Sequence, residues 1–254
     1  KAILKTFKLR TPNLLSWYKQ DDRYSRETLQ GDLERLRDYY MDRGYANFQI
    51  NSTQVQITPE KKDICIDINI NQGEVYKVSS VKLAGTFVVP GPELERLVEI
   101  RPGEIFNRKL ITDTEKLIED RLGEDGYAFA KVDPVPTPND SNHTVALTFF
   151  VDPGNRVYVR NITFSGEPAI NDIVLRREMR QLEGSWYSQA AIDRSKIRLQ
   201  KLGYFKTVDV DKKLVPGTQD KVDVTVKVEE QSAGSMQFGI VYSQYSGIIL
   251  NASV

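Results

Sequence analysis

The chain has 254 residues, of which 40% are hydrophobic and 28% charged, the balance of an ordinary globular protein rather than of a disordered one. Lys and Arg together number 35, as do Asp and Glu, so the net charge is zero and the basic excess typical of a nucleic-acid-binding protein is missing. No stretch of about 18 apolar residues predicts a transmembrane helix, and the single Cys65 cannot form an internal disulfide bond.

One short pattern occurs three times: an amphipathic helix, then a glycine, then an aromatic residue that opens a strand. The glycines are Gly44, Gly126 and Gly203, separated by 82 and 77 positions. Glycine commonly ends a helix because it adopts the left-handed conformation without steric cost. Three such sites at nearly constant spacing predict a tandem array of similar repeats.

The spacing of apolar residues predicts the order β-α-α-β-β in each repeat, over roughly 75–80 residues. A short helical face is expected at 1–10. The main helices are expected at 25–44, 92–100, 110–122, 170–182 and 188–202. The strands are expected at 46–58 with a bulge at 51–53, and at 64–70, 76–83, 126–132, 145–151, 157–164, 204–210 and 222–228. The proline-rich segment 134–142 is expected to be a turn, and the first repeat lacks an opening strand.

The connections determine how the strands pair. The last two strands of a repeat form a hairpin and are antiparallel, whereas the opening strand arrives by a two-helix crossover and runs parallel to its neighbour. Both helices then cover one face of a three-stranded mixed sheet. The predicted fold class is therefore α+β, with tandem βααββ repeats at 1–74, 75–154 and 155–230 and a separate segment at 231–254.

The C-terminal segment alternates apolar with small or polar residues on both sides of a turn at 244–247. This alternation is typical of a transmembrane β-barrel strand, although the signal of a single strand is weak. A soluble edge hairpin has the same pattern, so the alternation leaves both interpretations open.

No catalytic, metal or cofactor site is predicted. His143 is the only histidine, so a His-based triad or a site with several histidines is ruled out, and its place in a polar turn favours a solvated side chain. Cys65 lies in the middle of a strand, which favours a structural thiol. Glycine-rich phosphate-binding motifs are absent. An enzyme would need a convergent polar pocket, and the sequence indicates none.

Two surfaces stand out as candidates for partner binding. Strand 46–58 is predicted at the border of its sheet, because strand 64–70 closes the hairpin and takes the central position. It carries no Pro or Lys, the residues that usually protect an edge, so it is predicted to bind partners by β-augmentation. The other surface is a basic helix face of Arg176, Arg177 and Arg180 that ends at Glu183. It is either solvated charge or a docking surface.

The βααββ repeats resemble POTRA domains, and three segments resemble the BamA branch of the Omp85 family. These segments are Leu33–Ala46, Ile50–Val55, and Asn155–Arg160 taken together with Leu175–Gln181. The three repeats look like the third to fifth POTRA domains, and 234–254 looks like the first hairpin of the barrel. A related two-partner secretion transporter would carry about two repeats, which the count of three disfavours.

The resemblance implies a periplasmic region of an outer-membrane protein of a Gram-negative bacterium, which receives unfolded outer-membrane proteins and docks accessory lipoproteins. It implies that the β-propeller lipoprotein BamB contacts the edge strand and residues 7–10, and that the helical-repeat lipoprotein BamD contacts Glu183. The predicted partner-binding residues are Phe7, Leu9, Arg10, Asn47, Gln49, Ser52, Thr53, Gln54, Val55, Gln56, Arg176, Arg177, Arg180 and Glu183.

Overall fold

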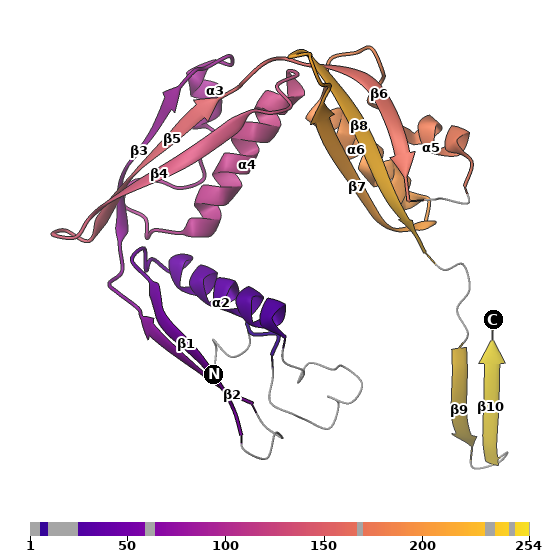
Figure 1. Cartoon of the computed structure of the whole chain (residues 1–254), viewed down its shortest axis with the longest axis horizontal. Coiled ribbons are helices and arrows are strands. Elements are labelled where there is room, and N and C mark those ends of the chain that lie inside the picture. Colours follow the sequence, from indigo (N-terminus) through magenta and orange to yellow (C-terminus); the bar gives the residue numbers. More distant parts are fainter. Residues whose placement is uncertain are drawn as a thin grey trace. The chain divides into compact units, whose positions relative to one another are not determined.

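The computed structural model describes residues 6–9, 25–58, 64–166, 170–231, 237–243 and 247–253. Its helices and strands follow one another as a series of helix-and-sheet repeats and a final hairpin (Figure 1). The chain divides into two compact units, one formed by 1–119 and 131–152 and the other by 120–130 and 153–254.

The first repeat contains helix α2 (Arg26–Met41) and the antiparallel strands β1 (Gln49–Ile57) and β2 (Ile64–Asn71). Helix α2 begins after Ser25, whose hydroxyl accepts a hydrogen bond from the Thr28 N–H. Its buried face contributes Leu36 and Tyr40 to a small core, in which Tyr40 stacks on Phe48 with ring centroids 4.5 Å apart. The register shifts between Ile50 and Ser52, which confirms the predicted bulge.

The second repeat contains a mixed sheet in the order β3-β5-β4. Its elements are β3 (Lys77–Gly85), α3 (Gly91–Glu95), α4 (Arg108–Glu124), β4 (Lys131–Asn139) and β5 (Thr144–Asp152). β3 runs parallel to the central β5, and β4 runs antiparallel to it. The predicted pairing is therefore confirmed.

The third repeat has the same arrangement, in the order β6-β8-β7. Its elements are β6 (Tyr158–Ser165), α5 (Asp172–Glu178), α6 (Gln189–Lys201), β7 (Phe205–Leu214) and β8 (Lys221–Glu230). Alternate residues of β8 from Val222 to Val228 are buried, and they share a core with Leu175 of α5 and Leu199 of α6. Both helices thus cover one face of the sheet, as the fold class requires.

Backbone hydrogen bonds show that equivalent residues of the second and third repeats are 81 positions apart. The Gly103 N–H donates to the Val78 carbonyl at 2.7 Å, and the Gly184 N–H donates to the Val159 carbonyl at the same distance. After the long helix the offset falls to 77, because α4 has 17 residues and α6 has 13. The difference is about one helical turn.

The glycines that end the long helices adopt the predicted left-handed conformation, with φ values of 100° at Gly44, 99° at Gly126 and 75° at Gly203. The Gly44 carbonyl accepts a hydrogen bond from the Tyr76 N–H at 2.8 Å, and the Gly126 carbonyl accepts one from the Val157 N–H at 2.9 Å. The same bond thus links each of these two helix ends to the start of the following repeat.

Several sequence predictions are wrong in detail. The strands expected at 46–58 and 126–132 begin only at Gln49 and Lys131, so Tyr45 and Tyr127 do not open them. The segment 134–139 is not a turn but part of β4, which tolerates Pro134, Pro136 and Pro138 because alternate N–H groups of an edge strand face away from the sheet. The short helices α3 and α5 end earlier than predicted. Residues 6–9 are not helical, because a few apolar residues at helical spacing do not suffice to form a short helix.

The C-terminal segment contains β9 (Gln237–Ser243) and β10 (Gly247–Ser253), which pair antiparallel as predicted. Among the described residues, none of the helices combines the length and the apolar character needed to span a bilayer.

Candidate functional site

Strand β1 forms one border of the two-stranded sheet that the structure describes in the first repeat. Gln49, Ser52, Gln54, Val55 and Gln56 are exposed. Thr53 is partly buried, because it lies on the face of the strand that also carries Ile50. The structure therefore places most of the predicted edge residues side by side on one accessible strand.

Asn47 does not belong to this edge, because β1 begins at Gln49. Its side-chain amide donates to the Tyr76 hydroxyl at 2.7 Å and to Asp140 Oδ1 at 3.1 Å, and the Tyr76 hydroxyl donates to the same carboxylate at 2.6 Å. The hydrogen bond from Tyr76, followed by that from Asn47, lowers the pKa of Asp140. Asn47 thus links the first repeat to the second.

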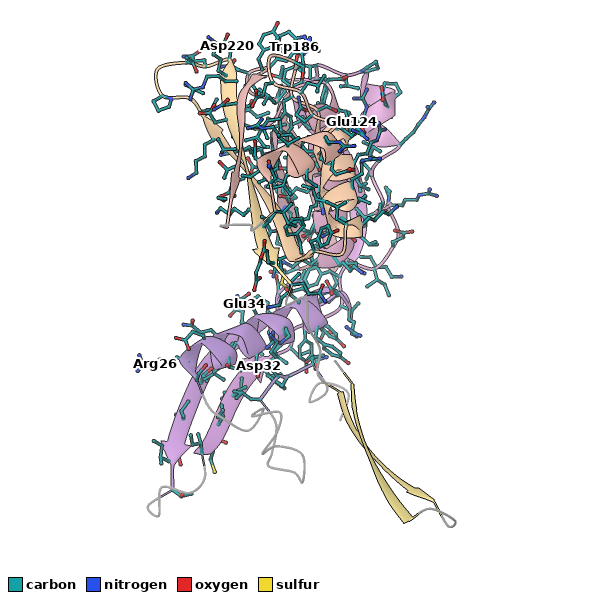
Figure 2. The ribbon with its side chains drawn as sticks, turned by 90° about the vertical axis from the view of Figure 1, so that its right-hand side faces the viewer. Arg26, Asp32, Glu34, Glu124, Trp186 and Asp220 are labelled. Carbon is teal, nitrogen blue, oxygen red and sulfur yellow. The ribbon has the colours of Figure 1, made fainter. Side chains whose placement is uncertain are left out.

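The segment around Phe7 and Leu9 is held against α2 by Asp32, a carboxylate with no exposed surface. Asp32 accepts hydrogen bonds from the Lys8 N–H at 2.7 Å and from the Leu9 N–H at 3.0 Å, and it also pairs with Arg35. Figure 2 labels Asp32 on this helix. Phe7 packs on the first core and is partly buried. Arg10 lies outside the described residues.

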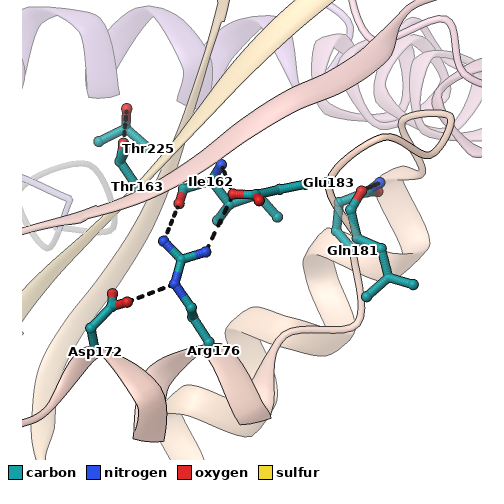
Figure 3. A network of polar contacts seen from close by, with 8 residues as sticks. Ile162, Thr163, Asp172, Arg176, Gln181, Glu183 and Thr225 are labelled. Atoms are coloured by element: carbon teal, nitrogen blue, oxygen red, sulfur yellow. Dashed lines mark hydrogen bonds and ion pairs between the residues drawn. The ribbon is translucent and has the colours of Figure 1, made fainter.

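Glu183 follows α5 and reaches the outer edge of β6 (Figure 3). Its Oε1 accepts a hydrogen bond from the Ile162 N–H at 2.7 Å and one from Arg176 Nη1 at 3.3 Å. Arg176 also donates through Nη2 to the Ile162 carbonyl at 3.0 Å and through Nε to Asp172 Oδ2 at 2.6 Å. The pairing with Asp172, more than that with Glu183, raises the pKa of Arg176.

The predicted basic face is therefore divided. Arg176 is bound to two carboxylates and to the backbone of β6. Arg180 is exposed, and its guanidinium donates to the carbonyls of Met179 and Arg177. Arg177 is exposed as well. The structure brings Arg176 and Glu183 together, and it leaves the other two arginines outside this network.

A family profile described as "Surface antigen variable number repeat", the POTRA family, matches residues 1–73, 76–154 and 157–231. The chain belongs to the POTRA family. Outer membrane protein assembly factor BamA of Neisseria meningitidis is 31% identical over 255 residues, covering 100% of this chain and 32% of the relative. That of Buchnera aphidicola is 33% identical over 251 residues, covering 98% of this chain and 40% of the relative. The chain thus spans less than half the length of these relatives.

Solved structures show which POTRA domains the chain resembles. The crystal structure of Haemophilus influenzae BamA POTRA3-5 is 38% identical, with a TM-score of 0.76, and the match covers 82% of this chain and 83% of that one. BamA from Haemophilus ducreyi lacking POTRA domains 1–3 is 39% identical, with a TM-score of 0.53, and the match covers 70% of this chain and 34% of that one. This is therefore a periplasmic POTRA region of the BamA type, in the Omp85 family.

Two POTRA residues near the Glu183 network were missed by sequence reasoning. Ile162 carries the backbone groups that Arg176 and Glu183 bind. Gln181 is 2% exposed, and its side chain bonds the backbone of Leu182, Trp186 and Ser188. It thereby orders the loop that carries Glu183 (Figure 3). The sequence signal that could have indicated Gln181 is its position directly before the Leu-Glu-Gly segment that ends the loop.

Proposed function

We propose that this POTRA region receives unfolded outer-membrane proteins along β1 and docks accessory lipoproteins at β1 and at Glu183. The observation that carries the proposal is the difference between the three equivalent edge strands β1, β4 and β7. β4 has prolines at three alternate positions, and β7 carries five charged residues. β1 has neither a proline nor a charge. Edges are usually protected by such residues, so the unprotected β1 edge is available for pairing.

The register shows which backbone groups β1 offers. Val55 pairs with Ile66, and Pro136 pairs with Leu147, and both central partners are related by the offset of 81. Val55 therefore occupies the position of Pro136. Because a proline in a ladder directs its nitrogen away from the partner strand, the N–H of Val55 faces outward. An added strand would find this donor and the equivalent ones at Thr53 and Ile57.

The substitution Val55→Pro tests this role. It removes one outward donor at a position where the second repeat already accommodates proline, so the hairpin should remain folded. We expect binding of an unfolded outer-membrane protein peptide and of the β-propeller lipoprotein BamB to weaken about tenfold. This is the effect of losing about one hydrogen bond between uncharged backbone groups.

Gln54→Pro is the matched control for this experiment. At this position the N–H faces β2, so proline should break the hairpin. Amide exchange separates the two cases. If Val55→Pro leaves the hairpin protected and both partners bind as before, partner binding does not use the β1 edge.

Docking of the helical-repeat lipoprotein BamD rests on a separate surface. The Glu183 side chain is 40% exposed, and its bonds to Ile162 and Arg176 use Oε1. Its second oxygen can accept a hydrogen bond from a cationic partner residue. Glu183 is thus a carboxylate that the fold positions and still presents to solvent.

The test is the substitution Glu183→Lys. The control is Asp220→Lys on the β7–β8 turn, which changes the net charge of the protein by the same amount. The first should weaken BamD binding about tenfold or more, because a like charge replaces an attractive one, and the second should not. Glu183→Gln should give an intermediate affinity. Equal loss in the two lysine variants would show that net charge, rather than this site, decides the affinity.

A further inference from the structure

The second and third repeats have a groove at the same place, between the opening strand and the segment that follows the short helix. In the second repeat the groove has a volume of about 620 Å³. In the third repeat it has about 170 Å³. The residues that line both grooves correspond at the offset of 81: Val81 to Ile162, Glu95 to Arg176, Val98 to Met179, Ile100 to Gln181, and Pro102 to Glu183.

In the third repeat, two side chains occupy the edge of β6 in the manner of a neighbouring strand. Ile162 directs its N–H and its carbonyl away from the central β8. The Glu183 carboxylate accepts from that N–H, and the Arg176 guanidinium donates to that carbonyl (Figure 3). An added peptide strand would supply the same acceptor and the same donor. The third repeat thus closes this edge with its own side chains.

In the second repeat the same edge has no such closure. Val81 pairs with Leu147 as Ile162 pairs with Val224, so its N–H and carbonyl also face outward, and those of Leu83 follow by alternation. Glu95 replaces the donor Arg176 with an acceptor, and Pro102 replaces the carboxylate of Glu183 with a ring. Within the described residues, no side chain hydrogen-bonds the backbone of Val81 or Leu83.

The lining of this groove favours a particular partner. Val81, Val98 and Ile100 make its floor apolar. Lys82, Arg96 and Arg101 line it as well, against the single carboxylate of Glu95. None of these three cations takes part in an ion pair with a described residue. The groove therefore combines open backbone groups, an apolar floor and a positive excess.

We propose that the outer edge of β3, from Val81 to Leu83, binds an extended polypeptide segment that carries acidic side chains. The segment adds as a fourth strand beside β3, and its carboxylates face Lys82, Arg96 and Arg101. Only two residues of β3 direct their backbone groups outward in this stretch, so the affinity is low, with Kd on the order of 0.1–1 mM. This edge belongs to another repeat and to another strand position than β1, so the site is separate from the proposed function.

The experiment uses the full 254-residue chain and a nine-residue peptide of alternating Thr, Val and Glu, acetyl-Thr-Val-Glu-Val-Thr-Val-Glu-Val-Thr-amide. Residue-resolved amide exchange should show slower exchange at Val81 and Leu83 as peptide is added. A peptide with Lys in place of both Glu residues should bind about tenfold more weakly, because its charges oppose those of the groove. Because exchange is resolved by residue, binding at β1 gives a different signature. Protection confined to β1, or none at Val81 up to several times the expected Kd, would overturn the proposal.

Exchanging the closing residues between the two repeats provides the matched variants. The double substitution E95R/P102E gives the second repeat the pair found in the third, and it should abolish the peptide-dependent slowing of exchange at Val81. The reverse change, R176E/E183P, should make exchange at Ile162 slow when peptide is added, which it does not do in the unchanged protein. If E95R/P102E folds, as judged by its unfolding temperature, and binds the acidic peptide as before, the edge is not the site. If it fails to fold, the exchange map of the unchanged protein still decides.

Discussion

The second and third repeats share a fold and a core, but they differ at their edges and at their junctions. Each has a glycine at the end of its opening strand and a buried hydroxyl group on its long helix. The third repeat closes the outer edge of its opening strand with Arg176 and Glu183, and the second leaves it open. The βααββ fold therefore constrains the residue types at the positions that hold its layers together. It leaves the residues along the strand edges free to acquire different roles.

The largest expected effect concerns the glycines that the two repeats share. Gly85 and Gly166 have φ values of 103° and 111°, and a Cβ at either would overlap a carbonyl oxygen, that of Val151 or of Val228. Gly85→Ala and Gly166→Ala should each lower the free energy of unfolding of their own repeat by about 3 kcal/mol.

The control for these two variants is Gly91→Ala, which meets nothing within 4 Å and should change the stability by less than about 0.5 kcal/mol. Denaturant unfolding followed by amide exchange reports each repeat separately. A loss at Gly85 with none at Gly166 would break the equivalence of the repeats at this position.

The next effect concerns the buried hydroxyls. Thr114 Oγ1 accepts a hydrogen bond from the Glu99 N–H at 3.0 Å, and Ser195 Oγ accepts one from the Arg180 N–H at 2.7 Å. Thr114→Val and Ser195→Ala should each cost about 1–2 kcal/mol of unfolding free energy, because a shielded N–H loses its acceptor. Equilibrium unfolding measures both, and the exposed Thr137→Val should be close to neutral. Effects that differ by more than about twofold would show that the two hydroxyls are not equivalent.

The smallest effect concerns the junctions, where the two repeats differ. Tyr76 corresponds to Val157, so only the junction before the second repeat has the hydrogen-bonded group of Asn47, Tyr76 and Asp140. The hydrogen bond from Tyr76 lowers the pKa of Asp140 below its usual 3.8. Its contribution to stability is therefore present above pH 3.8 and is lost as the pH falls through the lower, folded-state pKa.

The same hydrogen bond raises the pKa of Tyr76 above its usual 10.0. Its contribution is present below pH 10 and is lost as the pH rises through the folded-state pKa. Tyr76→Phe should move the pKa of Asp140 up towards its usual value, as an NMR titration of the side chain would show. An Asp140 pKa that does not respond would mean that Asn47 alone holds the carboxylate.

Sequence patterns predicted the repeats because the constraints involved are local. A glycine that ends a helix has a visible signature at Gly44, Gly126 and Gly203, and the alternation in β8 indicates a strand with one buried face. The same patterns failed at Pro134, Pro136 and Pro138, because proline breaks a central strand but fits an edge strand, and the position of a strand in its sheet is not a local property.

The candidate sites were less predictable, for the same reason. The border position of β1 followed from the hairpin connection, and the structure places β1 at an edge. Its lack of Pro and Lys was the reason to predict partner binding there. The role of Asn47 depends on Asp140, which is 93 positions away. The role of Glu183 depends on the backbone of Ile162, and any residue except proline can supply an N–H and a carbonyl, so the sequence contains no sign of this contact.

The additional turn of α4 affects how the chain folds. Residues Asp120–Ala130, which include the end of this helix, belong to the second compact unit, whereas the helix begins in the first. One continuous helix therefore contributes residues to both units. Unfolding of the third repeat should therefore fray α4 from its C-terminal end, because those residues belong to the second unit, while the start of the helix belongs to the first.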